Sequence, residues 1–288
     1  LLDSLRRGIG NDYVGQVSRD VVRLLRADAN PGELIWEAVA YGAPRAEFGW
    51  GHAIASLTDC LAMADHYEGD ERALPIVQAI AGVAETERGR PVQTLPDPVA
   101  TMPADPRADF RRFVESEQLL PAQSILRGAI EAGLAADELR PWFTDVVSDH
   151  FLSYGHGAIY VQKAFQLLDR LGWARADTVL AYLVPTIVHG TREDKLPYMQ
   201  LFHRGLRQLD LDELARAAAA PDPHWSDDGR LLGALLGVDR TEAALAAGAF
   251  IMFDARPVYT VFTGDRFEVV PANSIDRASM VRAKAEFQ

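Results

Sequence analysis

The chain has 288 residues, a formal net charge of −12, 48% hydrophobic residues and 24% charged residues, which is an ordinary composition for a globular protein. The acidic balance argues against nucleic acid and against an anionic membrane surface as partners. A single cysteine, Cys60, excludes an intrachain disulfide and an iron–sulfur cluster held by this chain alone. Because no apolar run approaches about 20 residues and no signal peptide is evident, we expect a cytoplasmic protein.

Apolar residues recur at helical spacing through most of the chain. The first helical unit, residues 1–88, is predicted to hold helices near 11–27, 31–40, 48–67 and 71–87. Residues 89–106 contain five prolines, which remove backbone donors, so we interpret them as a linker. The second unit, residues 107–220, is predicted to hold helices near 107–117, 121–134, 137–152, 154–171 and 175–189, and two shorter helices near 196–209 and 211–220.

The pattern changes in the last segment, residues 221–288. Two Ala/Leu-rich helices are expected there, followed by a β-hairpin in which Val258–Phe262 pairs with Phe267–Val270 around a turn at Gly264. The predicted fold class is therefore mainly α: two repeated multi-helix units packed as one bundle, with a small C-terminal β-hairpin.

Two stretches of the chain resemble each other, which is why a repeat is predicted. Each begins with an acidic-Leu pair, soon meets a Trp, reaches an aromatic-Gly-His step and ends at an Asp thirteen residues beyond the His. The aromatic-Gly-His steps are Trp50-Gly51-His52 and Tyr154-Gly155-His156. Repeated placement predicts that His52 and His156 occupy equivalent positions on packed helices near a pseudo-twofold axis.

The two histidines are the first candidates for a reactive site. Imidazole is a common general base and a common ligand for iron and zinc. We expect His156 to face a buried pocket shared with His52, with His189 as a third member and with Tyr154 and Trp50 as walls. The alternative is that the glycines serve helix packing and the histidines are satisfied core residues; the sequence leaves the two about evenly balanced.

Other candidates depend on the course of the second Gly-His helix. If one helix continues through Ser153–Gly155, Asp149 lies two turns before His156 on the same face, and His150 does not. Carboxylate with imidazole suits non-haem iron, so His52, His156, His189 and Asp149 are candidate ligands, and Trp50 and His150 candidate cofactor contacts. The first copy has no matching acid, which weakens a symmetric two-metal site.

A resemblance to a known family lies in the second unit. Its features are Gly155-His156, the run LLDRLGW at 167–173, Leu183-Val184 and Thr191-Arg192. These stretches resemble helical modules that accompany Rieske-type [2Fe–2S] domains in bacterial proteins, and the helix order and paired histidines have a fainter likeness to questin-oxidase-like enzymes.

The resemblance implies an oxidative function. We expect a monooxygenase-like oxidoreductase that acts on a small organic substrate, with a Rieske domain or other electron donor as partner and with His52, His156, His189 and Tyr154 as catalytic residues. The alternative is a non-catalytic helical module that forms a homo-oligomer or docks a redox partner. A small-molecule sensor or carrier is a third reading.

Overall fold

The computed structural model describes residues 1–210, 212, 216, 258–262 and 267–271. The chain divides into two compact units, Leu1–Lys195 and Leu196–Gln288. The predicted helices between 211 and 249 lie almost wholly outside the described residues. Within the described part of the chain, no helix is both long enough and apolar enough to cross a lipid bilayer.

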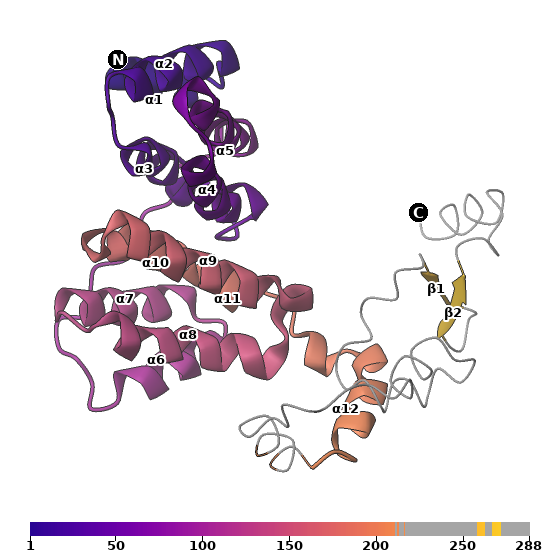
Figure 1. Cartoon of the computed structure of the whole chain (residues 1–288). Helices are drawn as coiled ribbons and strands as arrows, with labels where there is room; N and C mark the ends of the chain where they lie inside the picture. The colour runs from indigo at the N-terminus through magenta and orange to yellow at the C-terminus, as the bar shows by residue number, and fades with distance from the viewer. Residues whose placement is uncertain (211, 213–215, 217–257, 263–266, 272–288) are drawn as a thin grey trace. The chain divides into compact units, whose positions relative to one another are not determined.

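The compact unit Leu1–Lys195, called the first unit from here on, includes the predicted unit 1–88 and most of the predicted unit 107–220. It is built from two sets of helices (Figure 1). The first set, coloured indigo to violet, comprises α1 (Leu2–Gly10), α2 (Val14–Arg26), α3 (Pro31–Gly42), α4 (His52–Met63) and α5 (Ala73–Thr86). The second set comprises α6 (Pro106–Glu115), α7 (Leu119–Glu131), α8 (Ala136–His150), α9 (His156–Leu171), α10 (Ala176–Ala181) and α11 (Val184–Val188).

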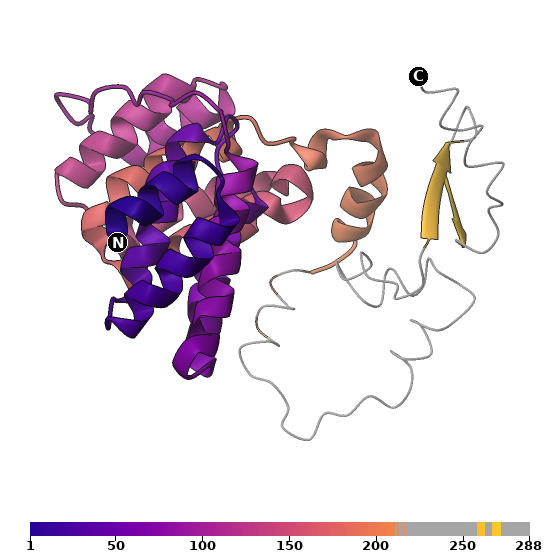
Figure 2. The same cartoon turned by 90° about the horizontal axis from the view of Figure 1, so that it is seen from above.

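The two sets are copies of one arrangement. Their helices start 103 to 105 residues apart, at Leu2 and Pro106, Val14 and Leu119, Pro31 and Ala136, His52 and His156, and Ala73 and Ala176. Helix pairs repeat as well: α1 packs on α2 as α6 packs on α7, and α3 on α4 as α8 on α9. Figure 2 shows α1 and α2 side by side at one face. The predicted repeat therefore extends over nearly the whole first unit.

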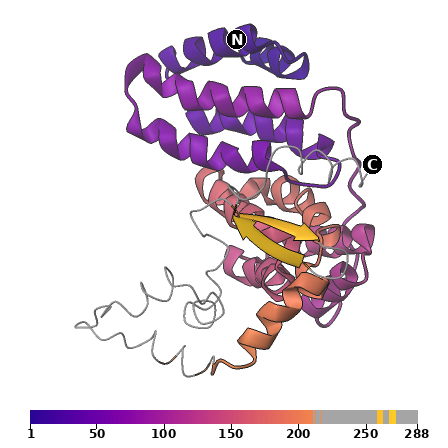
Figure 3. The ribbon, with the colours of Figure 1, turned by 90° about the vertical axis from the view of Figure 1, so that its right-hand side faces the viewer.

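The two copies meet along α4 and α9 (Figures 1 and 3). Contacts between these helices join residues 104 or 105 positions apart: His52 with His156, Thr58 and Asp59 with Lys163, and Asp65 with Arg170. Contacts that progress in the same direction along both helices mean that the helices run parallel. Because equivalent residues touch each other, an approximate twofold axis passes between them.

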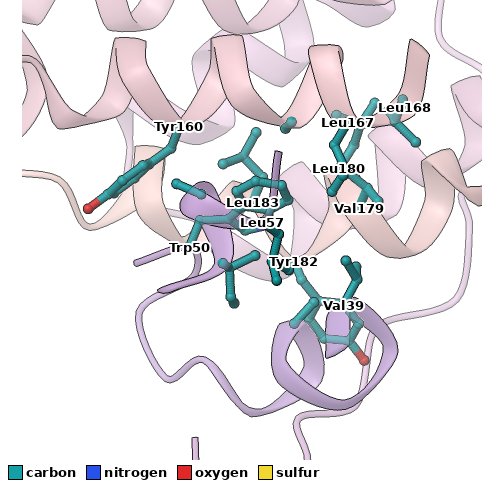
Figure 4. Packing of buried hydrophobic residues seen from close by; sticks show 14 of the residues in the cluster. Val39, Trp50, Leu57, Tyr160, Leu167, Leu168, Val179, Leu180, Tyr182 and Leu183 are labelled. Carbon is teal, nitrogen blue, oxygen red and sulfur yellow. The ribbon is translucent and has the colours of Figure 1, made fainter. Parts of the chain in front are cut away.

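One hydrophobic core spans both copies. In Figure 4, buried side chains of the first copy face those of the second, and labelled members are Val39, Trp50, Leu57, Leu167, Leu180 and Leu183. Complete burial of a side chain of this size contributes roughly 1.5–3 kcal/mol, so the shared core is the main force that holds the copies together. The helices α4 and α9 are thereby fixed relative to each other.

Local sequence sets the helix starts. Asn30 accepts a hydrogen bond from the Gly32 backbone N–H at 2.8 Å and precedes Pro31, and Asp105 caps α6 in the same way before Pro106. The segment from 91 to 105 contains no helix or strand. It is nevertheless attached to both copies, because Gln93 bonds the Pro44 and Ala46 carbonyls and its own carbonyl accepts from the Tyr182 hydroxyl.

Three expectations about helices need correction. A helix at Leu2–Gly10 was not expected. The helix expected from 48 begins only at His52, after a short 3-10 turn and a loop. The helix expected over 175–189 is divided into α10 and α11, because Pro185 lacks the backbone N–H that would continue the ladder.

The second unit is described only in part. It contains α12 (Gln200–Leu206) and two strands, β1 (Val258–Phe262) and β2 (Phe267–Pro271). The strands pair antiparallel with Thr260 opposite Val269. The turn at 263–266 lies outside the described residues, and the hairpin therefore stays a prediction.

Candidate functional site

The candidate site lies where α4 and α9 begin. His52 is the first residue of α4 and His156 the first residue of α9, and each follows a glycine at the N-cap. Their Nε2 atoms lie 3.2 Å apart, and the two rings meet nearly at right angles with centroids 5.0 Å apart. Two residues that the sequence singled out as equivalent are thus in direct contact.

The outer nitrogens of the pair have different partners. Nδ1 of His156 lies 2.5 Å from the Ser153 carbonyl oxygen, and Nδ1 of His52 lies 3.4 Å from the hydroxyl of Tyr160. A carbonyl can only accept, so His156 carries its proton on Nδ1 and offers a lone pair at Nε2. His52 then donates from Nε2 to His156 and accepts from Tyr160 at Nδ1. The partners define one directed chain of hydrogen bonds from Tyr160 to Ser153.

Tyr160 was not predicted, although the repeat contains a signal for it. It stands at the position that Ser56 occupies in the first copy, and the Ser56 hydroxyl bonds the Ala53 carbonyl inside its own helix. Figure 4 shows Tyr160 extending from α9 with its hydroxyl directed away from the core. Burial raises the pKa of Tyr160 above its usual value, which keeps the phenol protonated as a donor. The substitution makes two equivalent histidines chemically different.

The loop before α9 is strained. Phe151, Ser153 and Tyr154 have φ values of 45°, 48° and 57°, and Gly155 has φ 88°. Left-handed conformations of residues other than glycine cost about 1–3 kcal/mol each and persist only where surrounding contacts enforce them. This loop separates α8 from α9, as the two predicted helices implied, and it directs the Ser153 carbonyl toward His156. The condition for aligning Asp149 with His156, one helix that continues through Ser153–Gly155, is therefore not met.

The segment that includes and follows α11 anchors the loops before both histidines. The Thr186 hydroxyl donates to the Phe48 and Trp50 carbonyls at 3.3 and 3.4 Å. Ser153 donates from its backbone N–H to the Thr191 carbonyl at 2.8 Å, and the Thr191 N–H returns a bond to the Ser153 hydroxyl at 3.1 Å. Residues 186–191 therefore position both entry loops at once.

The site is at the surface rather than in a buried pocket. His52 is exposed and His156 is half-buried. A buried pocket that encloses both rings was expected, but the exposure of His52 means that the pair does not lie in one. Trp50 is 3% exposed and belongs to the core, whereas Tyr154 is 59% exposed. Tyr154 therefore does not form a buried wall.

The other predicted members have partners of their own. The ring of His189 packs edge-on against Phe48, with centroids 6.4 Å apart. His150 bonds Glu115 through Nε2 at 2.8 Å and Asp194 through Nδ1 at 3.1 Å. The carboxylate of Asp149 forms an ion pair with Arg111 at 2.5 Å.

These positions bear on a metal site. The facial-triad site of non-haem iron enzymes needs two histidines and a carboxylate, and Asp149 does not join the histidines. Among the residues described, no group of three or more His, Cys, Asp or Glu side chains is arranged to hold a metal ion. Cys60 is half-buried, and burial, followed by the charge of Asp59, raises the pKa of its thiol, so it is a poor nucleophile. The chemistry of the site lies in His52, His156 and Tyr160.

Comparison with protein-family models, with curated proteins and with solved structures finds no match for this chain.

Proposed function

We propose that the chain is an enzyme in which His52 and His156 form the acid–base centre for a small organic substrate. The observation that carries the proposal is the 3.2 Å contact between the Nε2 atoms, together with the Ser153 carbonyl that fixes the proton of His156 on Nδ1. A histidine held in one tautomer by its second nitrogen is suited to proton transfer at the first. The exposed ring of His52 provides access for a substrate.

The surroundings suit a reaction that develops negative charge on an oxygen. The starts of α4 and α9 meet at the pair, and neither has a side-chain cap. A helix N-terminus carries a partial positive charge of roughly half a unit, which stabilises negative charge nearby. Exposed apolar side chains in the same loops and first turn offer contacts to a small organic molecule: Phe48, Tyr154 and Ile159.

The oxidative class rests on the sequence resemblance to modules that accompany Rieske-type domains. Within that proposal, a separate donor supplies electrons and the histidine pair handles the protons. A non-haem iron centre at the pair would need ligands other than Asp149, whose carboxylate pairs with Arg111.

The test is turnover by the full chain, with a reduced Rieske-type donor and oxygen, on a panel of small phenols and cyclic ketones. His156→Gln is expected to reduce turnover about 10²- to 10⁴-fold, the usual contribution of a general acid–base group. His66→Gln, which changes an exposed histidine just beyond α4, is the control. Equal turnover in His156→Gln and wild type would refute the proposal.

A second function is favoured by the same exposed apolar side chains. Phe48 and Tyr154 are 65% and 59% exposed, and such residues are typical of docking surfaces. A non-catalytic module would show no turnover with any donor, and Phe48→Ser with Tyr154→Ser would abolish its assembly. Sedimentation of wild type and the double variant distinguishes this function from the enzyme.

A further inference from the structure

The distance between the Nε2 atoms of His52 and His156 also suits a metal ion bound between them. Two imidazole nitrogens bound to one ion at about 2.0–2.1 Å with tetrahedral geometry stand about 3.3 Å apart. The Nε2 atoms of His52 and His156 are 3.2 Å apart, and each belongs to the first residue of a helix fixed by the shared core. The two nitrogens therefore already have the separation of two ligands on one ion.

The outer nitrogens are arranged as they are around metal-bound histidines. Such histidines usually donate their second N–H to a carbonyl or another oxygen, which fixes the lone pair on the metal side. His156 meets this requirement through the Ser153 carbonyl at 2.5 Å. His52 faces the Tyr160 hydroxyl at 3.4 Å, and a hydroxyl accepts as readily as it donates.

We propose that His52 and His156 together bind one divalent first-row transition-metal ion, such as Zn²⁺, through their Nε2 atoms. The proposal rests on the same two side chains as the proposed function, but an ion on both Nε2 atoms occupies the lone pair that proton transfer at His156 uses, so the ion-bound and ion-free proteins are distinct states. Ion binding leaves His52 neutral: its proton moves from Nε2 to Nδ1, and the Tyr160 hydroxyl changes from donor to acceptor. No proton is released, and no residue is oxidised or reduced.

The remaining positions of the ion belong to oxygen ligands from solvent or substrate. Two acids from the same part of the fold, Asp149 and Asp194, are not available as further ligands, because Asp149 pairs with Arg111 and Asp194 with His150. The positive ends of α4 and α9 disfavour a bare cation and favour an anionic oxygen on it. Zinc sites in proteins usually have three or four protein ligands, so a site with two histidines leaves more positions open for oxygen ligands.

The test uses the full chain after chelation and the metal ion alone, with no substrate. Calorimetry is expected to show one Zn²⁺ per chain. Long-range ¹H–¹⁵N spectra of the imidazoles should show both Nε2 signals shift and a proton appear on Nδ1 of His52. His52→Gln and His156→Gln should each weaken binding at least tenfold, whereas the His66→Gln control should bind as wild type does.

Tyr160→Phe provides a second measurement that does not remove a ligand. Loss of the acceptor for His52 Nδ1–H should weaken Zn²⁺ binding about tenfold or more, the usual effect of losing such a partner. Unchanged affinity in His156→Gln, or unshifted Nε2 signals at saturating Zn²⁺, would overturn the metal site. Turnover of the chelated protein is measured separately, so failure of the metal site and failure of the acid–base function are distinguishable.

Discussion

The Nε2 atoms of His52 and His156 face each other at 3.2 Å because equivalent residues of two helical copies meet along α4 and α9. The same register places Asp59 beside Lys163, seven residues further along each helix. The histidine pair is thus one of several contacts between equivalent residues along an approximate twofold axis. At this contact the symmetry is broken by Tyr160, which stands where the first copy has Ser56 and donates a hydrogen bond to His52 only.

Tyr160→Phe is expected to weaken the preference of His52 for a proton on Nε2, which the hydrogen bond to His156 then maintains alone. The phenol is the donor to Nδ1 of that ring, and its loss also removes one hydrogen bond worth about 0.5–1.5 kcal/mol. Long-range ¹H–¹⁵N correlation of the His52 ring measures the tautomer. Tyr182→Phe is the matched control, since it removes the bond from Tyr182 to the Gln93 carbonyl and should leave the His52 ring unchanged. An unaltered His52 tautomer in Tyr160→Phe would contradict the directed chain.

The sequence was sufficient to predict that His52 and His156 occupy equivalent helices, and the structure brings them into contact. It did not reveal Tyr160, because the importance of that residue depends on a difference between the two copies and not on the pattern that they share. It predicted separate helices near 137–152 and 154–171 but left open whether one helix continued through Ser153–Gly155. No proline marks the break at 151–155, and contacts to Thr191, distant in sequence, enforce it.

Gly155→Ala is expected to destabilise the protein by about 1–2 kcal/mol, the usual cost of a left-handed conformation for a residue with a Cβ. The backbone there has φ 88°, and a Cβ would also lie 3.2 Å from the Phe151 ring. Urea unfolding measures the change. Gly82→Ala is the control, because Gly82 lies inside α5 with no atom within 4 Å of the added Cβ, and this substitution should stabilise by about 0.5–1 kcal/mol. Equal effects at both positions would show that the loop before His156 is not strained.

The extent of the repeat also exceeded what the sequence showed. The helices α1 and α6 differ in composition, yet both carry an Arg-Arg pair at matching positions, Arg6-Arg7 and Arg111-Arg112. Helix lengths and core positions are retained where residue identities are not, because burial constrains volume and polarity more than identity. An alignment on hydrophobic spacing with a fixed shift of about 104 residues would have found the full repeat.

Exchange of the charges at Asp59 and Lys163 should be tolerated. The two residues are equivalent across the axis and form an ion pair with side chains 54% and 23% exposed, so the pair contributes only about 0.2–1 kcal/mol. Asp59→Lys alone brings like charges together and should destabilise by a similar amount, and addition of Lys163→Asp should restore stability. A double-mutant cycle by urea unfolding measures the coupling, which 1 M salt should reduce. Failure of the double variant to recover would contradict the approximate symmetry.

Glu87 at the end of α5 makes the stability of the protein depend on pH. Its side chain is nearly inaccessible, and burial raises its pKa above the usual value, with a smaller opposing effect from the charge of Arg90. Because the folded state binds this proton more tightly than the unfolded state does, the contribution of Glu87 to stability is present below the unfolded pKa near 4.5 and is lost as pH rises through the folded pKa.

Glu87→Gln mimics the protonated carboxyl at every pH. It is expected to be more stable than wild type by about 1 kcal/mol at pH 8, since a buried carboxylate oxygen without a hydrogen-bond partner is costly. The difference should narrow as pH falls and vanish near pH 4. Urea unfolding at pH 8, 6 and 4 measures it, and Glu85→Gln at an exposed position of the same helix is the control. A wild-type protein that is more stable than Glu87→Gln at pH 8 would mean that the ion pair with Arg90 outweighs burial.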